Sequence, residues 1–264
     1  MKQTIRLILF FVTLSSFVSA QIPMKKGKAK EVCPFVMIGG GLGIPTQHFA
    51  SNYGDYFYHN ASGFAQKGYL GTIDLGLDFP KENCQVSLKT NYGSNPFNTN
   101  GYLKYLEQPP TQIYTHPGGT GVNYSAISSG YYKYISFLIK VETQIPVKKF
   151  SFGFYCAAGS SRFISFPDVK VAMDSASNHI VTGFSIGKNY GFALNYGTSI
   201  TYHFNSHFFI KTIFDYFYCH YNFDMHFITP QENGNQWFAK QELPEHYALP
   251  VTLLNISLGL GYRL

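Results

Sequence analysis

Three residues in the last quarter of the chain, His220, Asp224 and His226, carry side chains that can bind a metal ion or transfer a proton. Two imidazoles and a carboxylate can ligate zinc, and a histidine with an acid and a nucleophile is the arrangement of a hydrolase. Ser160 and Ser161 offer hydroxyl groups in another segment. The chain has no H-E-x-x-H motif. We therefore expect no catalytic residues, no cofactor and no metal site, with those three residues as the sole metal candidates.

A second set of residues could do electrostatic chemistry, because its members all fall on the polar side of alternating segments. The set contains four acids and four bases, so its formal charges cancel. Its members are Asp74, Asp78, Lys89, Lys140, Glu142, Lys211, Asp215 and Arg263. A buried charge without a partner is costly, so a shared interior predicts a network of ion pairs that fills it. The alternative is that the eight charges line a narrow path for ions.

The elements that must position these charges are strands, because apolar and polar residues alternate with a period of two. The clearest case is the C-terminal segment 254–264, where Leu, Ile or Tyr occupies every second position and small or polar residues fill the others. A strand with one face in lipid and one in a lumen has this pattern. The same pattern occurs in seven further segments: 35–45, 67–79, 84–93, 131–145, 150–159, 191–204 and 207–221.

The connections between these eight segments alternate in length. Short turns lie at 80–83, 146–149 and 205–206, and long connections lie at 46–66, 94–129, 160–186 and 223–249. Outer-membrane barrels have short periplasmic turns and long extracellular loops. The sequence therefore predicts an all-β fold, an eight-stranded antiparallel transmembrane β-barrel. The connection 94–129 is long enough for a further hairpin, which leaves ten strands as an alternative.

The composition agrees with a membrane barrel. Aromatic residues make up 18% of the chain and charged residues 13%, against about 25% charged residues in soluble domains. Barrels place aromatic girdles at both membrane interfaces. We assign the outer girdle to Tyr131, Tyr132, Tyr134, Tyr216, Tyr218, Tyr221 and Phe223, and the inner girdle to Phe79, Phe150, Tyr202, Phe204 and Tyr262.

The N-terminus has the features of a secretory signal peptide. Lys2 and Arg6 precede a short apolar stretch, and small residues end at Ala20. The stretch is too short for a membrane-spanning helix, which needs about 20 residues; an uncleaved anchor is the alternative. We expect a cleaved signal peptide at 1–20, a periplasmic tail at 21–34, a barrel at 35–264, and location in a Gram-negative cell outer membrane. The net charge of +6 comes from residues that are scattered apart from the basic stretch KKGKAK (25–30), which does not indicate nucleic-acid binding.

The chain has four cysteines, Cys33, Cys84, Cys156 and Cys219, and export permits disulfides. Their spacing is wide, without the close pairs that indicate a zinc site. We expect mostly free thiols. Cys33 and Cys84 both fall near the predicted inner rim, so they are the one pair for which a disulfide is worth testing.

The signal peptide, the Gly-aromatic hairpins, the opening GGGLGIPT (39–46) and the closing LGLGYRL (258–264) carry a family resemblance. The chain resembles the small outer-membrane β-barrel proteins of the OmpA-barrel, OmpX and OmpW kind, including PorT-like single-domain barrels. The resemblance implies a C-terminal signal for the barrel-assembly machinery, here Leu260, Tyr262 and Leu264. Those proteins usually end in an aromatic residue, whereas this chain ends in Leu264, which puts that recognition in doubt.

Two classes of function follow from a rigid barrel with long loops. The first is a structural or surface-interaction protein that binds an extracellular ligand or partner through loops 46–66, 94–129, 160–186 and 223–249, because loops on a rigid scaffold are where function usually lies. The second is a transport barrel for small solutes or hydrophobic compounds, as in the OmpW kind. An enzyme at the outer rim is a third. The expected partners are outer-membrane lipid and the barrel-assembly machinery.

Overall fold

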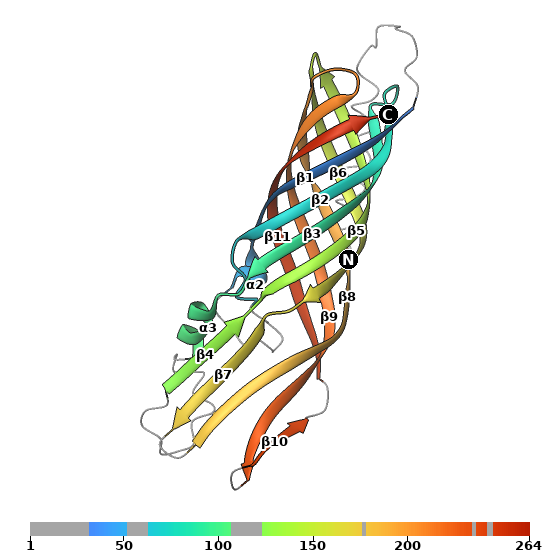
Figure 1. Ribbon diagram of the computed structural model, residues 1–264. Coiled ribbons are helices and arrows are strands. Elements are labelled where there is room, and N and C mark those ends of the chain that lie inside the picture. The colour runs from blue at the N-terminus through green and yellow to red at the C-terminus, as the bar shows by residue number, and fades with distance from the viewer. Residues whose placement is uncertain (1–31, 52–62, 107–122, 176–177, 234–235, 242–244) are drawn as a thin grey trace.

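A computed structural model describes residues 32–51, 63–106, 123–175, 178–233, 236–241 and 245–264 (Figure 1). The expected signal peptide (1–20) and most of the expected periplasmic tail (21–31) lie outside the described residues. The first strand begins at Cys33, two residues before the predicted start of the barrel.

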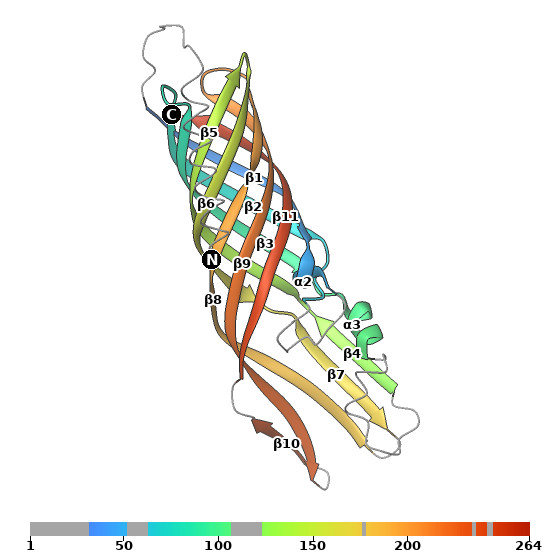
Figure 2. The same cartoon turned by 180° about the vertical axis from the view of Figure 1, so that it is seen from behind.

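Eight long strands pair with their neighbours in antiparallel fashion and form the barrel wall. They are β1 (Cys33–Pro45), β2 (Gly68–Phe79), β3 (Cys84–Pro96), β5 (Tyr131–Val147), β6 (Phe150–Ser165), β8 (Asn178–His203), β9 (Phe208–Asn233) and β11 (Glu245–Arg263). The sheet closes because β11 pairs with β1 on one side and with β9 on the other. The predicted eight-stranded antiparallel barrel is confirmed, and Figure 2 shows the closed wall from behind.

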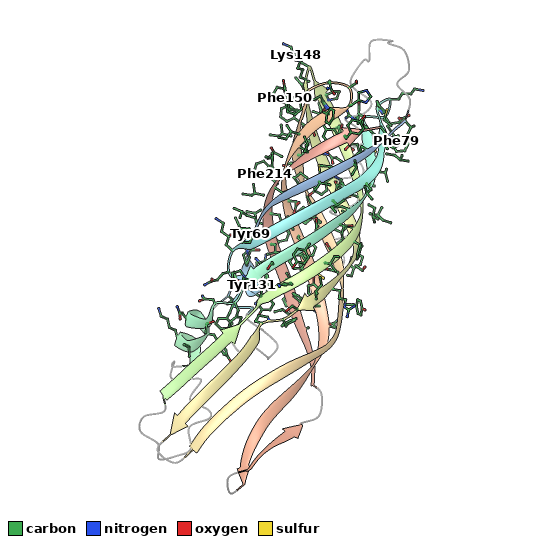
Figure 3. All side chains as sticks on the ribbon, in the orientation of Figure 1. Tyr69, Phe79, Tyr131, Lys148, Phe150 and Phe214 are labelled. Atoms are coloured by element: carbon green, nitrogen blue, oxygen red, sulfur yellow. The ribbon has the colours of Figure 1, made fainter. Side chains whose placement is uncertain are left out.

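The predicted alternation of faces is also confirmed. On β2, Ile73, Leu75 and Leu77 are exposed on the outer face, whereas Asp74 and Asp78 are buried inside. Many other exposed apolar side chains continue the outer face around the barrel, and Phe214 is one that Figure 3 labels on the outer wall. A closed antiparallel barrel with an apolar outside and polar residues inside is the structure of a transmembrane β-barrel.

The register of the strands fixes the width of the barrel. A row of paired residues that starts at Gly259 on β11 passes through Gly39, Thr72 and five further strands, and returns to β11 at Leu249, ten residues away. Eight strands with this shear of ten tilt by about 40° and close at a backbone radius of about 8 Å. Such an interior is wide enough for side chains and little else.

Two barrel strands continue beyond one end of the barrel and, with three shorter strands, build an extension, which corrects two of the predicted loops. Most of 160–186 and of 223–249 is strand: β8 and β9 are each 26 residues long, or about 85 Å, whereas spanning a membrane takes about 9–11 residues. The shorter strands are β4 (Asn123–Ser129), β7 (Asp168–Ser175) and β10 (Gln236–Gln241). Figures 1 and 2 show this extension flaring away from the barrel as two ribbons, β4–β7–β8 and β9–β10.

The described parts of the connection 94–129, residues 94–106 and 123–129, do not add a membrane-spanning hairpin. They contain the helix α3 (Thr99–Leu106) and then β4, which pairs with β7 in the extension and not with a barrel strand. A second short helix, α2 (Gln47–Ala50), lies in the connection 46–66. Neither helix among the described residues is long and apolar enough to cross a membrane.

The predicted outer aromatic girdle was partly wrong. Tyr131 is exposed as predicted, but Tyr132, Tyr134 and Tyr221 are at most 1% exposed and point into the barrel, because neighbouring residues of a strand face opposite sides. The side chain of Phe223 lies outside the described part. At the other end, Tyr202 contacts both Phe150 and Phe204, and Phe208 contacts Tyr262, as an inner girdle requires. Figure 3 shows Tyr69 and Tyr131 near the extension, and Phe79 and Phe150 near the turns.

Candidate functional site: the filled interior of the barrel

The centre of the interior is a chain of ion pairs between β2, β5 and β9. Lys140 bonds to Asp74 and lies 3.2 Å from a carboxylate oxygen of Glu142. Lys211 reaches Glu142 at 2.7 Å from the opposite side. Ser199 donates a further hydrogen bond of 2.7 Å to Glu142. Glu142 therefore bridges two lysines, and all four charged groups are buried.

A second ion pair crosses the barrel from β3 to β9. The ammonium group of Lys89 lies 3.0 Å from Asp215 and also donates hydrogen bonds to Tyr155 and Asn195. Asp215 accepts three more hydrogen bonds, from Tyr155 at 2.6 Å, Asn195 at 2.7 Å and Asn255 at 2.7 Å. Because each charge has several partners, this buried pair has the hydrogen bonds that offset desolvation.

A third ion pair, Arg263 with Asp78 at 2.8 Å, lies near the turn end of the barrel. Arg263 also donates to Nδ1 of His203 at 3.2 Å, and Nε2 of His203 lies 2.9 Å from the hydroxyl of Ser151. Since arginine can only donate, Nδ1 accepts and Nε2 of the neutral ring carries the proton. The distance between Ser151 and His203 is that of a nucleophile and its general base. This imidazole cannot accept the serine proton, however, because Nε2 already carries a proton.

The eight charges identified from the sequence therefore all lie inside the barrel, and the structure brings them together as three separate groups of ion pairs. The groups are Lys140–Asp74–Glu142–Lys211, Lys89–Asp215 and Arg263–Asp78.

A cluster of buried, mainly aromatic side chains lies in the half of the interior nearest the extension. The sequence interpretation missed this cluster. Tyr134 stacks on Phe217 with ring centroids 5.4 Å apart, and Phe163 packs on Tyr221 at 4.0 Å. Tyr132 packs on Phe49 of α2 at 5.1 Å, so the short helix helps to cover this mouth. The same cluster includes Phe64, Phe97, Tyr102, Leu138, Leu249, Val251 and Leu253. We call this cluster the aromatic plug.

The signal for the aromatic plug was present in the alternation. Tyr132 and Tyr134 share the strand face of Ser136 and Lys140, and Phe217 and Tyr221 share that of Lys211 and Asp215. Gly93 makes room for the ring of Tyr134. The two residues are directly opposite each other, and a Cβ atom at Gly93 would lie 2.0 Å from the tyrosine ring. A cross-strand aromatic residue that covers a glycine is a recurrent device of curved sheets.

One part of the interior wall is less well paired. On the neighbouring strands β2, β3 and β5, the polar side chains of Thr72, Asn91 and Ser136 form one row and are at most 3% exposed. None of these three has a hydrogen-bond partner among the described residues, and the same holds for one carboxylate oxygen of Asp74 and the hydroxyl of Ser87. Buried polar groups usually have partners, often water, so this row is the part of the interior suited to water or a small polar solute.

The candidate metal ligands lie on one strand, β9, and not in a loop. His220 and Asp224 are four residues apart, which in a strand is about 13 Å, so the three residues cannot together surround one ion. No group of three or more metal-binding side chains occurs among the residues that the structure describes. The structure places His220 exposed on the outer face; the side chains of Asp224 and His226 lie outside the described set.

No disulfide joins any two of the four cysteines, all of which belong to the described residues. Cys156 is exposed on the outer wall and Cys219 is 0% exposed inside it. In lipid vesicles, with Cys33→Ser and Cys84→Ser removing the other thiols, we expect a membrane-permeant maleimide to label Cys156 while a charged maleimide does not. Cys219 should react with neither reagent until the protein unfolds. Rapid labelling of Cys219 by the charged reagent would contradict the described interior.

The residues of the expected assembly signal lie at the end of β11. Leu260 and Leu264 are exposed on the outer face, and the ring of Tyr262 stacks on His207 at 5.7 Å. The backbone N–H of Leu264 donates to the carbonyl of Pro34 at 2.9 Å, which holds the chain end against the first strand.

No protein-family model matches the chain, and no curated relative matches it. Solved structures do match in overall shape. A major outer membrane protein from Thermus thermophilus is 9% identical, with a TM-score of 0.45, over 89% of this chain and 100% of that one. Neisserial surface protein A is 8% identical, with a TM-score of 0.38, over 89% and 100%. Outer membrane protein OprG from Pseudomonas aeruginosa is 11% identical, with a TM-score of 0.38, over 88% and 96%.

The assignment of the chain to the small transmembrane β-barrels rests on its own closed sheet of eight strands, its apolar outer face and its polar, ion-paired interior.

Proposed function

We propose that the protein is an outer-membrane barrel that conducts no ions and acts as a rigid base for its extension, which binds a partner or ligand outside the cell. The observation that carries this proposal is the filling of the interior along its length. From the turn end to the extension, the side chains are the Arg263–Asp78 pair, two further groups of ion pairs, and the aromatic plug. A barrel of this shear has little space beyond its side chains.

The orientation in this proposal follows from the alternation of connections. The short turns face the periplasm, and the extension of β4, β7, β8, β9 and β10 projects from the cell. It replaces the predicted loops 160–186 and 223–249 as the surface on which binding is expected, because surface segments on a rigid scaffold carry recognition. During biogenesis, the end of β11 would be presented to the barrel-assembly machinery.

The test is the conductance of the refolded barrel in a planar lipid bilayer. We expect no channel events at physiological voltages, with a heat-dependent shift on a gel as the control for folding. Lys140→Ala and Asp215→Ala each remove a member of an interior ion pair. Reproducible conductance of the wild-type barrel that changes in either variant would show that the charges line an ion path, and would contradict the closed interior.

Transport of a small polar solute is the second candidate, and the row of Thr72, Asn91 and Ser136 is the observation in its favour. A passing solute could bind to these side chains, which lack partners among the described residues. Asn91→Leu would remove the central side chain of the row. If vesicles containing the wild-type barrel take up a small sugar and the Asn91→Leu barrel does not, transport is supported over the closed barrel.

No catalytic role is proposed. The Ser151–His203 contact has the proton on the wrong imidazole nitrogen for a base, and the His220–Asp224 spacing along a strand is too wide for one active site. An unchanged phenotype of His220→Ala would agree with this assignment.

A further inference from the structure

Two cations lie on the outer face of the barrel near the extension. Lys133 on β5 alternates with the buried Tyr132 and Tyr134, and Arg162 on β6 alternates with the buried Ser161 and Phe163. Both side chains must therefore point away from the interior, towards the membrane. Arg162 is exposed and Lys133 is half-buried.

The register makes the two cations neighbours. Arg162 is directly opposite Ile135 of β5, and Lys133 is the next outward-facing residue along that strand, just beyond a β-bulge at Lys133/Tyr134 that pairs Lys133 with Ser165. Diagonal neighbours of this kind are about 7–8 Å apart. Because the strands tilt as a shear of ten requires, directly paired residues are not at the same height. The partner on β6 lies about 3 Å nearer the extension than the residue that it faces on β5. This difference brings Arg162 and Lys133 to nearly the same height on the barrel.

Aromatic side chains flank both cations. The ammonium group of Lys133 lies 6.0 Å from the ring centre of Tyr131, and the guanidinium of Arg162 lies 5.2 Å from that of Tyr190. Tyr131 and Tyr190 are both about half exposed. Tyrosine is enriched where the membrane meets water, so we place the two cations at the headgroup level of the leaflet on the extension side.

No carboxylate neutralises these cations among the described side chains. Asp74, Asp78, Glu142 and Asp215 are inside the barrel and take part in its ion pairs. Glu82, the remaining acid with a described side chain, lies in the turn between β2 and β3, at the other end of the barrel. A cation on the lipid face is costly in the bilayer centre and close to neutral at the interface, where it can bind an anionic headgroup.

We propose that Lys133 and Arg162 form a binding site for the phosphate group of an acidic lipid in the leaflet on the extension side. The guanidinium of Arg162 offers paired N–H donors that match phosphate oxygens, and Lys133 adds a second point charge. Tyr131 and Tyr190 hold the two side chains at the interface and cover the upper part of the lipid. The site lies on the outer wall, so it does not depend on whether the interior is closed.

The experiment is a titration of the folded, full-length barrel in neutral detergent with lipid A, followed by native mass spectrometry. The test variant is Lys133→Gln/Arg162→Gln. The matched control is Lys148→Gln/Lys149→Gln, which removes the same charge in the turn at the other end (Figure 3). Each cation near a membrane surface contributes about 1 kcal/mol to the binding of acidic lipid. We therefore expect the test variant to bind lipid A about 30-fold more weakly, with the control unchanged.

Two further arms identify the ligand. Dephosphorylated lipid A should bind the wild-type barrel no better than it binds the test variant, and inorganic phosphate should displace lipid A only at far higher concentration. The proposal is overturned if both variants bind lipid A as the wild type does, if both lose it equally, or if dephosphorylated lipid A binds equally well. It is also overturned if inorganic phosphate competes on equal terms, since the site would then serve a free anion. A gel shift on heating verifies that each variant is folded.

Discussion

Asp215→Ala is expected to lower the free energy of unfolding by about 3–5 kcal/mol, because it leaves the buried ammonium group of Lys89 without its counter-ion. Asp215 is also the shared acceptor for Tyr155, Asn195 and Asn255, so one substitution disturbs hydrogen bonds from four strands. The measurement is unfolding by guanidinium in lipid vesicles, followed by circular dichroism and by the gel shift on heating.

Two further variants make this expectation specific. Asp215→Asn keeps the shape and one acceptor oxygen, so it should unfold between the wild type and Asp215→Ala. It also remains informative if Asp215→Ala fails to fold. Glu82→Ala removes an exposed acid in a turn and should change stability by no more than about 0.5 kcal/mol. Equal stability of Asp215→Ala and Glu82→Ala would show that the Lys89–Asp215 pair is not a buried contact on which the fold depends.

Tyr134→Ala is the second substitution with a large expected effect. Tyr134 is 1% exposed and stacks on Phe217 within the aromatic plug, so its removal should cost about 3–5 kcal/mol, as for other large aromatic residues in well-packed interiors. Tyr131, three residues earlier on the same strand, is exposed on the outer face. Tyr131→Ala should therefore cost about 1 kcal/mol or less.

The pair also tests which tyrosines belong to the girdle and which to the interior. Both proteins would be unfolded in vesicles under identical conditions, and only the difference between them matters. Similar losses in the two variants, or a larger loss for Tyr131→Ala, would contradict the inward direction of Tyr134.

The barrel could be predicted from the sequence because successive residues of its strands face lipid and the polar interior in turn. Asp74, Lys140 and Glu142 stand out on the polar face because a buried charge is tolerated only where it has a partner. The strand ends could not be predicted in the same way. The bilayer sets a minimum length for a strand, and β8 and β9 continue beyond it, paired to each other and to β7 or β10.

The ion pairs inside the barrel could not be predicted from the sequence for a different reason. Alternation says that Lys89 and Asp215 face inwards, but β3 and β9 are not neighbours in the sheet. Which charges meet across the lumen depends on the shear and on where the large rings sit. Tyr134 and Tyr221 are a different case: they were assigned to the girdle by their chemical type, although their position in the alternation places them inside.

The Arg263–Asp78 pair has a consequence for the closure of the sheet into a barrel. Arg263 is on the last strand and Asp78 on the second, so the pair reaches across β1 and spans the junction where the two ends of the sheet meet. A slip of two residues at this junction would keep every apolar side chain in lipid, so alternation alone cannot reject it. It would, however, move Arg263 by about 7 Å and separate it from the buried carboxylate of Asp78. The pair therefore favours the correct register at the closure of the barrel over a register that is shifted by two residues.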